Sequence, residues 1–388
     1  MLFLRLNLQN NIKIYIENSI TNIKSSDWDN CNSKGNIFLS YNFLKLLEDS
    51  NSININTGWT PIYFCLKMNS NIIAVVPSFI KNHSQGEFVF DHAWAQAYQS
   101  LGLNYYPKLL IASPFSPVTG NRVLMNTKGN ETIKEKLFVY IKKFCIEKAI
   151  SSIHVNFFDH SELDFFKNQD FLIRYGEQFH FVNKGYNSFD EFLNTLSYKN
   201  RKKIIKERSS IKKQNINIEV IKKNNLNKKL CEKMYQFYIS TIKKKWSYNY
   251  LSKDFFIKLP QYLNNESILI LAKKNKEILA GALNFLSKNI LYGRYWGSNV
   301  NIKNLHFEVC YYQAMEVAIK NKYQKVEAGA QGAHKIKRGY LPKLTYSAHY
   351  IFNHKLRLAI ENFLDEEKKI VLNDIDYINK KYSPYKIT

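Results

Sequence analysis

Cysteine is scarce in this chain of 388 residues, and the few copies are scattered. There are five: Cys31, Cys65, Cys145, Cys231 and Cys310. They are odd in number, widely spaced and form no C-x-x-C pair, which argues against a disulfide framework and against a thiolate zinc site. Reduced thiols of this kind are typical of a cytoplasmic protein.

Long apolar runs are absent as well. No stretch of about 18 uncharged apolar residues occurs, so the sequence predicts no transmembrane helix. The start of the chain, MLFLRLNLQNNIKIYIENSI, lacks the extended apolar segment and the small-residue cleavage site of a secretory signal. We therefore expect a cytoplasmic protein.

Acidic residues are outnumbered: 32 Asp and Glu stand against 56 Lys and Arg, a formal net charge of +24. Such a surplus would attract nucleic acid, an anionic membrane or phosphorylated ligands. The chain is also crowded with Lys, Asn and Ile, as A/T-rich coding would give, and lysines spread over solvated faces would produce the same total. The net charge alone therefore does not select a partner.

The sequence does contain enough apolar material for sizeable cores, at 45% hydrophobic and 15% aromatic residues. Its length suggests about two or three domains. A pattern of strand, strand, loop, helix and strand occurs around 61–157 and again around 267–330. Each copy predicts a mixed, mostly antiparallel sheet flanked by helices, which makes the fold class α+β. We place one domain at 1–182 and a second at 183–388.

The region between the two copies is expected to be largely helical. It begins with a helix over 159–180, whose last part has a strand-like turn at 174–176 and a strand pattern at 178–181. The most basic run of the chain follows as KNRKKIIKER at 199–208. A helix over 199–213 would carry a narrow isoleucine stripe, with cations around the rest. Three interpretations stay open for it: a solvated face, a phosphate-binding surface for a polyanion such as tRNA, or a membrane-surface contact.

The most unusual stretch is EAGAQGAHKIKRGYLPKLTYSAH at 327–349. Gly329 and Gly332 allow positive φ or a close approach of backbone to a ligand. His334, just beyond them, is a residue type that exchanges a proton near neutral pH. A flexible turn beside titratable groups is typical of a site for an anion or an acyl group. A tight strand-to-loop connection with solvated charges would use the same residues.

Three blocks resemble a bacterial family called FemAB-like, or peptidoglycan biosynthesis/recognition, in the GNAT (N-acetyltransferase) superfamily. The blocks are KNHSQGEFVFDHAW at 81–94 with YYPKL at 105–109 and PFSPVTG at 114–120, LYGRYWGSNVNIKNLHFEVCYYQ at 291–313, and GAQGAHKIKRGYLPKLTYSAH at 329–349. The resemblance covers about residues 35–352. It implies a GNAT-type acyltransferase with two tandem GNAT-like domains. Better-known Fem-type relatives transfer an amino acid from aminoacyl-tRNA to the peptide of a cell-wall precursor.

Two departures from the family pattern concern the acyl donor. The acetyl-CoA signature Arg/Gln-x-x-Gly-x-Gly/Ala, which would place backbone N–H groups on a pyrophosphate, has no clear copy. Ala333 stands where the family has a glutamate. Acyl-CoA and aminoacyl-tRNA therefore both stay open as co-substrate, and no tightly bound cofactor is expected. In a GNAT fold the donor's pantetheine enters where two strands splay apart, a feature we expect beside 329–338.

Acyl transfer to an amine needs a base, donors for the oxyanion and a proton for the leaving group. The candidate bases are His334, Glu327, Glu308 and His306. The backbone at Gly329 and Gly332 would contact the donor. His306 and Glu308 begin an expected helix, so capping and dipole complementation are their structural alternative.

The candidate substrate-binding residues are polar or aromatic. They are Lys81, His83, Glu87, Asp91, Arg294, Trp296, Gln331, Lys335 and Arg338. The first four form a compact group that would line a cleft or simply close a loop. Trp296 has core packing as its alternative, and Arg294 would be costly to bury without an anion. No H-x-x-x-H-type pair occurs, so no metal site is expected.

Two functions stay open. The first is an acyltransferase that moves an acetyl or aminoacyl group to an amine acceptor, such as a cell-wall precursor. The second is a non-catalytic binding module that recognises a cell-wall precursor, or tRNA through the basic helix.

Overall fold

The computed structural model describes residues 12–245, 248–329 and 332–386. The chain divides into two compact units. Unit 1 runs to Gly176 and resumes over Thr345–Val371, and unit 2 covers Glu177–Leu344 and the chain from Leu372. Compared with the expected domains 1–182 and 183–388, unit 1 also takes in a late segment of the chain.

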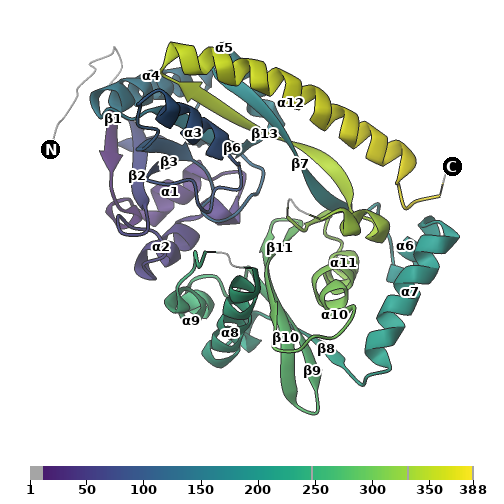
Figure 1. Ribbon diagram of the computed structural model, residues 1–388. Helices are drawn as coiled ribbons and strands as arrows, with labels where there is room; N and C mark the ends of the chain where they lie inside the picture. The colour runs from purple at the N-terminus through teal and green to yellow at the C-terminus, as the bar shows by residue number, and fades with distance from the viewer. Residues whose placement is uncertain (1–11, 246–247, 330–331, 387–388) are drawn as a thin grey trace. The chain divides into compact units, whose positions relative to one another are not determined.

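Unit 1 is built on a sheet with the strand order β1-β2-β3-β4-β6, to which the end of β13 is added (Figure 1). Its strands are β1 (Ile12–Glu17), β2 (Trp59–Met68), β3 (Asn71–Lys81), β4 (Lys108–Ile111), β5 (Leu124–Met125), β6 (Ser152–Phe158) and β13 (Leu341–Ile351). Neighbouring strands are antiparallel except β4 and β6, which are parallel.

The helices of unit 1 pack on both faces of this sheet. They are α1 (Ser25–Cys31), α2 (Tyr41–Asp49), α3 (His92–Ser100), α4 (Glu131–Glu147), α5 (Leu163–Asn168) and the start of α12 (His354–Lys381), with 3-10 turns η1 (Ile20–Asn22), η2 (Ile37–Leu39) and η3 (His160–Glu162). Val155 points into an apolar core that contains Leu137 and Ile141 of α4. Because alternate strand residues face opposite ways, His154 lies on the other face, where it stacks on Trp94 of α3.

Unit 2 repeats the arrangement with the order β8-β9-β10-β11-β12, to which the end of β7 is added. Its strands are β7 (Leu172–Val182), β8 (Asn217–Lys222), β9 (Ser267–Lys274), β10 (Glu277–Ser287), β11 (Ile290–Ser298) and β12 (Lys325–Glu327). Again all neighbours are antiparallel except one pair, β11 and β12. Each unit is thus an antiparallel meander, a helix and a strand parallel to the meander's last strand. This confirms the predicted α+β class and the repeat.

The helices of unit 2 surround a core that includes Ile204, Met315 and Val326. They are α6 (Phe189–Thr195), α7 (Tyr198–Lys212), α8 (Lys228–Lys245), α9 (Lys253–Tyr262), α10 (Leu305–Phe307), the π-helical turn η5 (Glu308–Tyr312), α11 (Gln313–Lys320) and the 3-10 segments η4 (Lys223–Asn225) and η6 (Ala333–Arg338). Helix α7 confirms the predicted basic helix. Within the described ranges, no helix combines the length and apolar character needed to cross a bilayer.

In chain order, the strand added to each unit's sheet follows the last strand of the other copy of the repeat. β7 follows β6 in the chain but pairs with β12, whereas β13 follows β12 and pairs with β6. The expected helix over 159–180 is wrong for most of its length, because α5 ends at Asn168 and β7 begins at Leu172. The run FLIRY at 171–175 is rich in aromatic and β-branched residues, which favours a strand.

Candidate functional site

In unit 2 the parallel strands β11 and β12 pair over three residues, Ile290–Tyr292 with Lys325–Glu327, and their pairing stops there, at the end of β12. β12 ends there, whereas β11 continues to Ser298. At Trp296, α8 forms a hydrogen bond with β11, because Thr241 Oγ1 donates to Trp296 O at 2.8 Å. The backbone of β11 between these two contacts therefore continues past the end of β12, after which the glycine-containing stretch follows in the chain.

A β-bulge lies at the same place on β11. The register with β10 shifts between Leu283 and Asn284, which leaves Arg294 as the extra residue. A bulge kinks a strand and redirects a side chain. Burial lowers the pKa of the Arg294 guanidinium, while Tyr295 and Glu327 act in the opposite direction. Arg294 thus lies near the end of β12, where the two strands part.

The segment after β12 depends on its glycines. Gly329 and Gly332 have φ of +79° and +115°, values that L residues with side chains rarely adopt. A Cβ at Gly332 would stand 2.5 Å from the His334 ring, so only glycine lets the imidazole lie there. Lys335 Nζ donates to Gly329 O at 2.9 Å, which closes the segment on itself. The predicted contact of this backbone with a donor stays a prediction.

Arg338 anchors the same segment to α7. Its Nη2 and Nε donate to the Glu207 carboxylate at 2.7 and 3.1 Å, and its Nη1 donates to His334 O at 2.6 Å. Its guanidinium carbon lies 3.4 Å from the centre of the Phe307 ring. The structure therefore gives Arg338 a positioning role, because it fixes the backbone that carries His334.

Glu308 also faces α7. It is 4% exposed and accepts hydrogen bonds from Arg208 Nη2 at 2.9 Å and from Gln313 Nε2 at 2.8 Å. Arg208 bridges to Glu316 as well, with Nη1 donating at 2.9 Å. The Glu308 carboxylate is therefore held in a network with Arg208 and Gln313 within unit 2.

Glu327 ends β12 and is 2% exposed. Lys325 Nζ lies 2.7 Å from its Oε1, and His180 Nε2 lies 4.0 Å from its Oε2. Burial lowers the pKa of His180 to about 4, so this imidazole is neutral near pH 7. Glu327 is paired with Lys325 beside the strand separation.

His334 is the exposed member of an aromatic group. Its Nε2 shares a hydrogen bond of 2.9 Å with the Tyr311 hydroxyl, and burial raises the pKa of Tyr311, so the phenol keeps its proton. The His306 ring lies 6.2 Å from the His334 ring and 5.2 Å from the Trp296 ring, centre to centre. The structure thus brings together three of the predicted residues and adds Tyr311, which the sequence did not single out.

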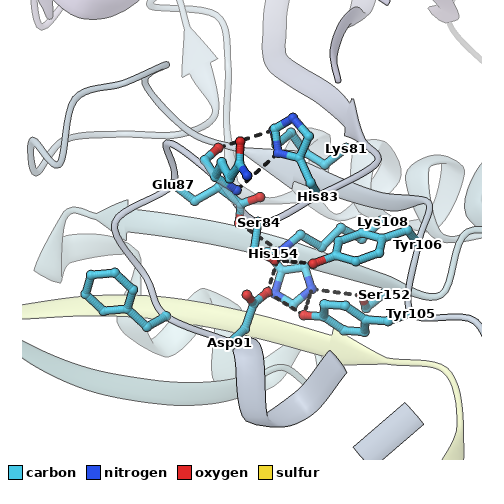
Figure 2. A network of polar contacts seen from close by, with 12 residues as sticks. Lys81, His83, Ser84, Glu87, Asp91, Tyr105, Tyr106, Lys108, Ser152 and His154 are labelled. Carbon is cyan, nitrogen blue, oxygen red and sulfur yellow. Dashed lines mark hydrogen bonds and ion pairs between the residues drawn. The ribbon is translucent and has the colours of Figure 1, made fainter. Parts of the chain in front are cut away.

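In unit 1 the predicted group at 81–91 surrounds a lysine that sequence reasoning missed. Lys108 is fully buried, and its Nζ donates to Glu87 Oε2 at 2.8 Å, to Ser84 Oγ at 2.9 Å and to Asp91 Oδ2 (Figure 2). Tyr105 OH donates to the same Asp91 oxygen at 2.5 Å. Glu87 and Asp91 are therefore brought together as the two anions of one buried network.

The other two members of the group lie at its edge. Lys81 Nζ donates to Gly58 O at 3.1 Å and lies 3.9 Å from the Trp59 ring centre. The Gln85 N–H donates to His83 Nδ1 at 3.1 Å, so His83 Nε2–H donates to Thr57 O at 2.9 Å. His83 is thereby neutral, and burial followed by the nearby Lys81 charge lowers its pKa.

Two histidines extend the network across β6 and β13. His154 Nδ1 and His349 Nδ1 share a hydrogen bond of 2.7 Å, and Ser347 Oγ lies 2.9 Å from His349 Nε2. Burial, followed by neighbouring charges, holds the pKa of both rings well below the usual range, so both are neutral. Ser152 Oγ shares a hydrogen bond of 2.8 Å with His154 Nε2. The sequence feature that could have indicated this part of the network is a polar residue at every second position of these two strands.

Burial and charge set the ionisation of this network. Burial raises the pKa of Glu87 to about 7 even though Lys108 lowers it. Burial acts likewise on Asp91, but the Lys108 ammonium outweighs it and the pKa of Asp91 is lowered. Burial lowers the pKa of Lys81 to about 7. Near neutral pH the network therefore holds Lys108 and Asp91 charged, with Glu87 and Lys81 both close to titration.

Gln331 lies outside the described residues. In the described part of the chain, no group of three or more His, Cys, Asp or Glu side chains is arranged to hold a metal ion. The remaining predicted residues fall into two sets. Lys81, His83, Glu87 and Asp91 are in unit 1, and the others, from Arg294 to Arg338, are in unit 2.

Two copies of a mixed, mostly antiparallel arrangement of strands, each with one parallel strand pair, make up the GNAT-like fold that the sequence predicted. The chain belongs to the FemAB-like family, peptidoglycan biosynthesis/recognition, which it matches over residues 19–387. The predicted family is thus confirmed. A comparison with curated proteins finds no match.

Solved structures share the fold at low sequence identity. A crystal structure of FemX aligns with a TM-score of 0.55 at 13% identity, covering 87% of this chain and 98% of FemX. L-PGS from Bacillus licheniformis aligns at 0.51 and 10% identity, covering 82% and 94%. The C-terminal domain of a putative lysylphosphatidylglycerol synthetase from Agrobacterium fabrum aligns at 0.52 and 10%, covering 86% and 95%. Family and fold together support an acyltransferase enzyme.

Proposed function

We propose that this chain transfers an acyl or aminoacyl group to an amine, with the donor bound in unit 2 where β11 and β12 separate. The observation that carries the proposal is the three-residue pairing of these strands, which stops where the Gly329–Gly332 segment begins. A β-strand can bind an extended ligand at its edge by strand-type hydrogen bonds. Pantetheine of an acyl-CoA has amide groups for such bonds, whereas an aminoacyl-tRNA would offer the carbonyl and amine of its aminoacyl group.

His334 is the proposed general base. In the tautomer whose Nε2–H donates to the Tyr311 oxygen, Nδ1 carries the lone pair that takes a proton from the attacking ammonium. That nitrogen lies beside Gly332, where no side chain excludes a substrate. Tyr311 keeps its own proton because burial raises its pKa, so it can protonate the leaving group. Arg338 serves this pair by holding the His334 carbonyl.

The acceptor is proposed to be an amine of a cell-wall precursor, in keeping with the family's description. Polar residues of unit 1, Lys81, His83, Glu87 and Asp91, are the proposed acceptor-binding group. Charged tRNA and acyl-CoA are made in the cytoplasm, and the cysteines are free thiols, so we place the reaction there.

Replacing His334 by Ala tests the base. Loss of a positioned general base should lower single-turnover transfer by about 10²- to 10⁴-fold, while circular dichroism and melting temperature stay those of the wild type. His354→Ala, at the exposed start of α12, is the matched control and should transfer at the wild-type rate. A wild-type rate in His334→Ala would remove His334 from the mechanism.

The donor is tested separately, by thermal shift and calorimetry with acetyl-CoA, longer acyl-CoAs and charged tRNA. Binding to the native state alone raises the melting temperature in proportion to the logarithm of ligand concentration. Stabilisation by one class identifies the donor. If none of them stabilises the protein, both donor versions of the proposal fail.

A second function, binding without catalysis, has one observation in its favour. The solvent side of α7 exposes Lys199, Lys202, Lys203 and Lys206, while two of the three isoleucines of its apolar stripe are buried. Of these four, Lys203 alone has an ion pair in the described structure, at 4.0 Å from Glu207. A row of exposed lysines on one face, three of them without an ion pair in the described structure, is suited to the phosphates of a polyanion.

A further inference from the structure

The buried network of unit 1 has acceptor atoms without donors. Glu87 Oε1 and Asp91 Oδ1 receive no hydrogen bond in the described part of the chain, although the residues are only 4% and 2% exposed. The other oxygen of each carboxylate contacts Lys108 Nζ. A buried carboxylate oxygen without a donor is costly, so such an atom needs an explanation.

The network is also short of positive charge. Lys108 is the cation that contacts both carboxylates, so two anions share one ammonium. Burial raises the pKa of Glu87 to about 7 in spite of that ammonium, as expected for a carboxylate that lacks a cation of its own. A second positive charge at this point would allow both acids to ionise.

In the described residues no other basic group forms an ion pair with these acids, although the charge of Lys81 also lowers the pKa of Glu87. Lys81 Nζ is directed to Gly58 O and the Trp59 ring. Arg174, on β7, donates to both carboxylate oxygens of Glu367 on α12, at 2.7 and 2.6 Å. His154 and His349, which face the network from β6 and β13, are held neutral by burial. Tyr105 and Ser84, the remaining neighbours, carry no positive charge.

We propose that Glu87 and Asp91 form a subsite for the primary ammonium group of a ligand. Its N–H groups would donate to Glu87 Oε1 and Asp91 Oδ1, opposite the contacts that Lys108 makes to the other two oxygens. A primary ammonium provides three donors and one charge, which meets both deficits at once. The subsite would recognise an amine-bearing acceptor, and this role rests on the proposed function.

Methylammonium chloride is the probe. Tetramethylammonium chloride is the matched control, because the tetramethylammonium ion has the same charge but no N–H donor. The full chain is melted at pH 8 in mixtures of the two salts at constant total concentration. Replacing tetramethylammonium by methylammonium should raise the melting temperature by about 2 °C or more and saturate. Equal melting temperatures in both salts would overturn the subsite and leave a buried water as the partner of these oxygens.

Glu87→Gln should lose most of the methylammonium effect, whereas Glu361→Gln, exposed on α12, should retain it. In the wild type, affinity for methylammonium should rise about tenfold between pH 6 and pH 8, since Glu87 must ionise to receive the cation, and the rise should vanish in Glu87→Gln. An unchanged effect in that variant would refute the assignment. His334→Ala should still respond to methylammonium, so failure of the catalytic proposal and failure of the subsite are distinguishable.

Discussion

Arg338 and Glu308 show how a charged residue in a signature block can serve the fold. Their partners on α7, Glu207 and Arg208, are 131 and 100 residues away in the chain. The sequence could identify both residues as unusual, because of the blocks that contain them. It could not show that their charges are neutralised within unit 2, because the register that brings α7 to them is set by tertiary packing. Lys108 was missed for the same reason.

Glu87 should make stability depend on pH. Its folded pKa of about 7 lies above the usual value of 4.5, so ionisation destabilises the native state. The stability that protonated Glu87 contributes is present below about pH 4.5 and is lost as the pH rises through 7. Glu87→Gln mimics the protonated form, so the wild type should lose up to about 3 kcal/mol relative to this variant between pH 4.5 and 8.

Urea unfolding of both proteins across this pH range measures the difference. Glu361→Gln, which removes an exposed carboxylate from the same unit, should give a constant offset from the wild type at every pH. Parallel stability profiles for Glu87→Gln and the wild type would contradict the raised pKa of Glu87.

At the scale of elements, the sequence predicted that α7 is a helix. It predicted only part of which α7 residues are buried and which are exposed. Of the predicted stripe of Ile204, Ile205 and Ile211, the first and last are buried, whereas Ile205 is 48% exposed. Glu207 lies on the same stripe, three residues after Ile204 and four before Ile211, and it is buried with them. A charged residue at a core-facing position is the signal that this helix has an ionic partner. The strand separation, by contrast, has no signature in either strand, because it depends on where β12 stops.

The exposed lysines of α7 allow a test of polyanion binding. Replacing Lys199, Lys202, Lys203 and Lys206 by Ala should weaken tRNA binding and lower the slope of log affinity against log salt by about three to four. Replacing Lys355, Lys369, Lys380 and Lys381 on α12 removes the same charge elsewhere and serves as the control. Filter binding at salt concentrations from about 50 to 200 mM measures both the affinity for tRNA and the slope of log affinity against log salt. Equal slopes for the two variants would show that α7 is only a solvated face.

At the scale of the whole molecule, the repeat was visible in the sequence and the exchange of strands was not. The order of strands and helices gave two similar copies, from which a boundary at 182/183 followed. Which strand completes each sheet is a matter of pairing between segments far apart in the chain, and β7 and β13 have similar alternating patterns. Those patterns do not specify that β6 pairs with β13. The domain boundary stays a prediction, but the pairing has a consequence that can be measured.

Because β13 completes the sheet of unit 1, a defect in its last residues should loosen that unit although they lie near the end of the chain. Ala348 is fully buried, pairs with Val155 and packs in the unit 1 core. Ala348→Asp would bury an unpaired charge there, which costs several kcal/mol. Hydrogen exchange should accelerate in β2, β3 and β6, while β9 and β10 keep the wild-type rate.

Lys343→Asp supplies the control, since it introduces the same side chain on the same strand at an exposed position of unit 2. It should leave exchange in both units unchanged. Equal acceleration of β9 and β10 in Ala348→Asp would show that the two units open together and would contradict their treatment as separate compact bodies. Confinement of the effect to unit 1 would mean that the family's N-terminal unit cannot be tested as residues 1–182 alone, because the strand that completes its sheet is made more than 150 residues later.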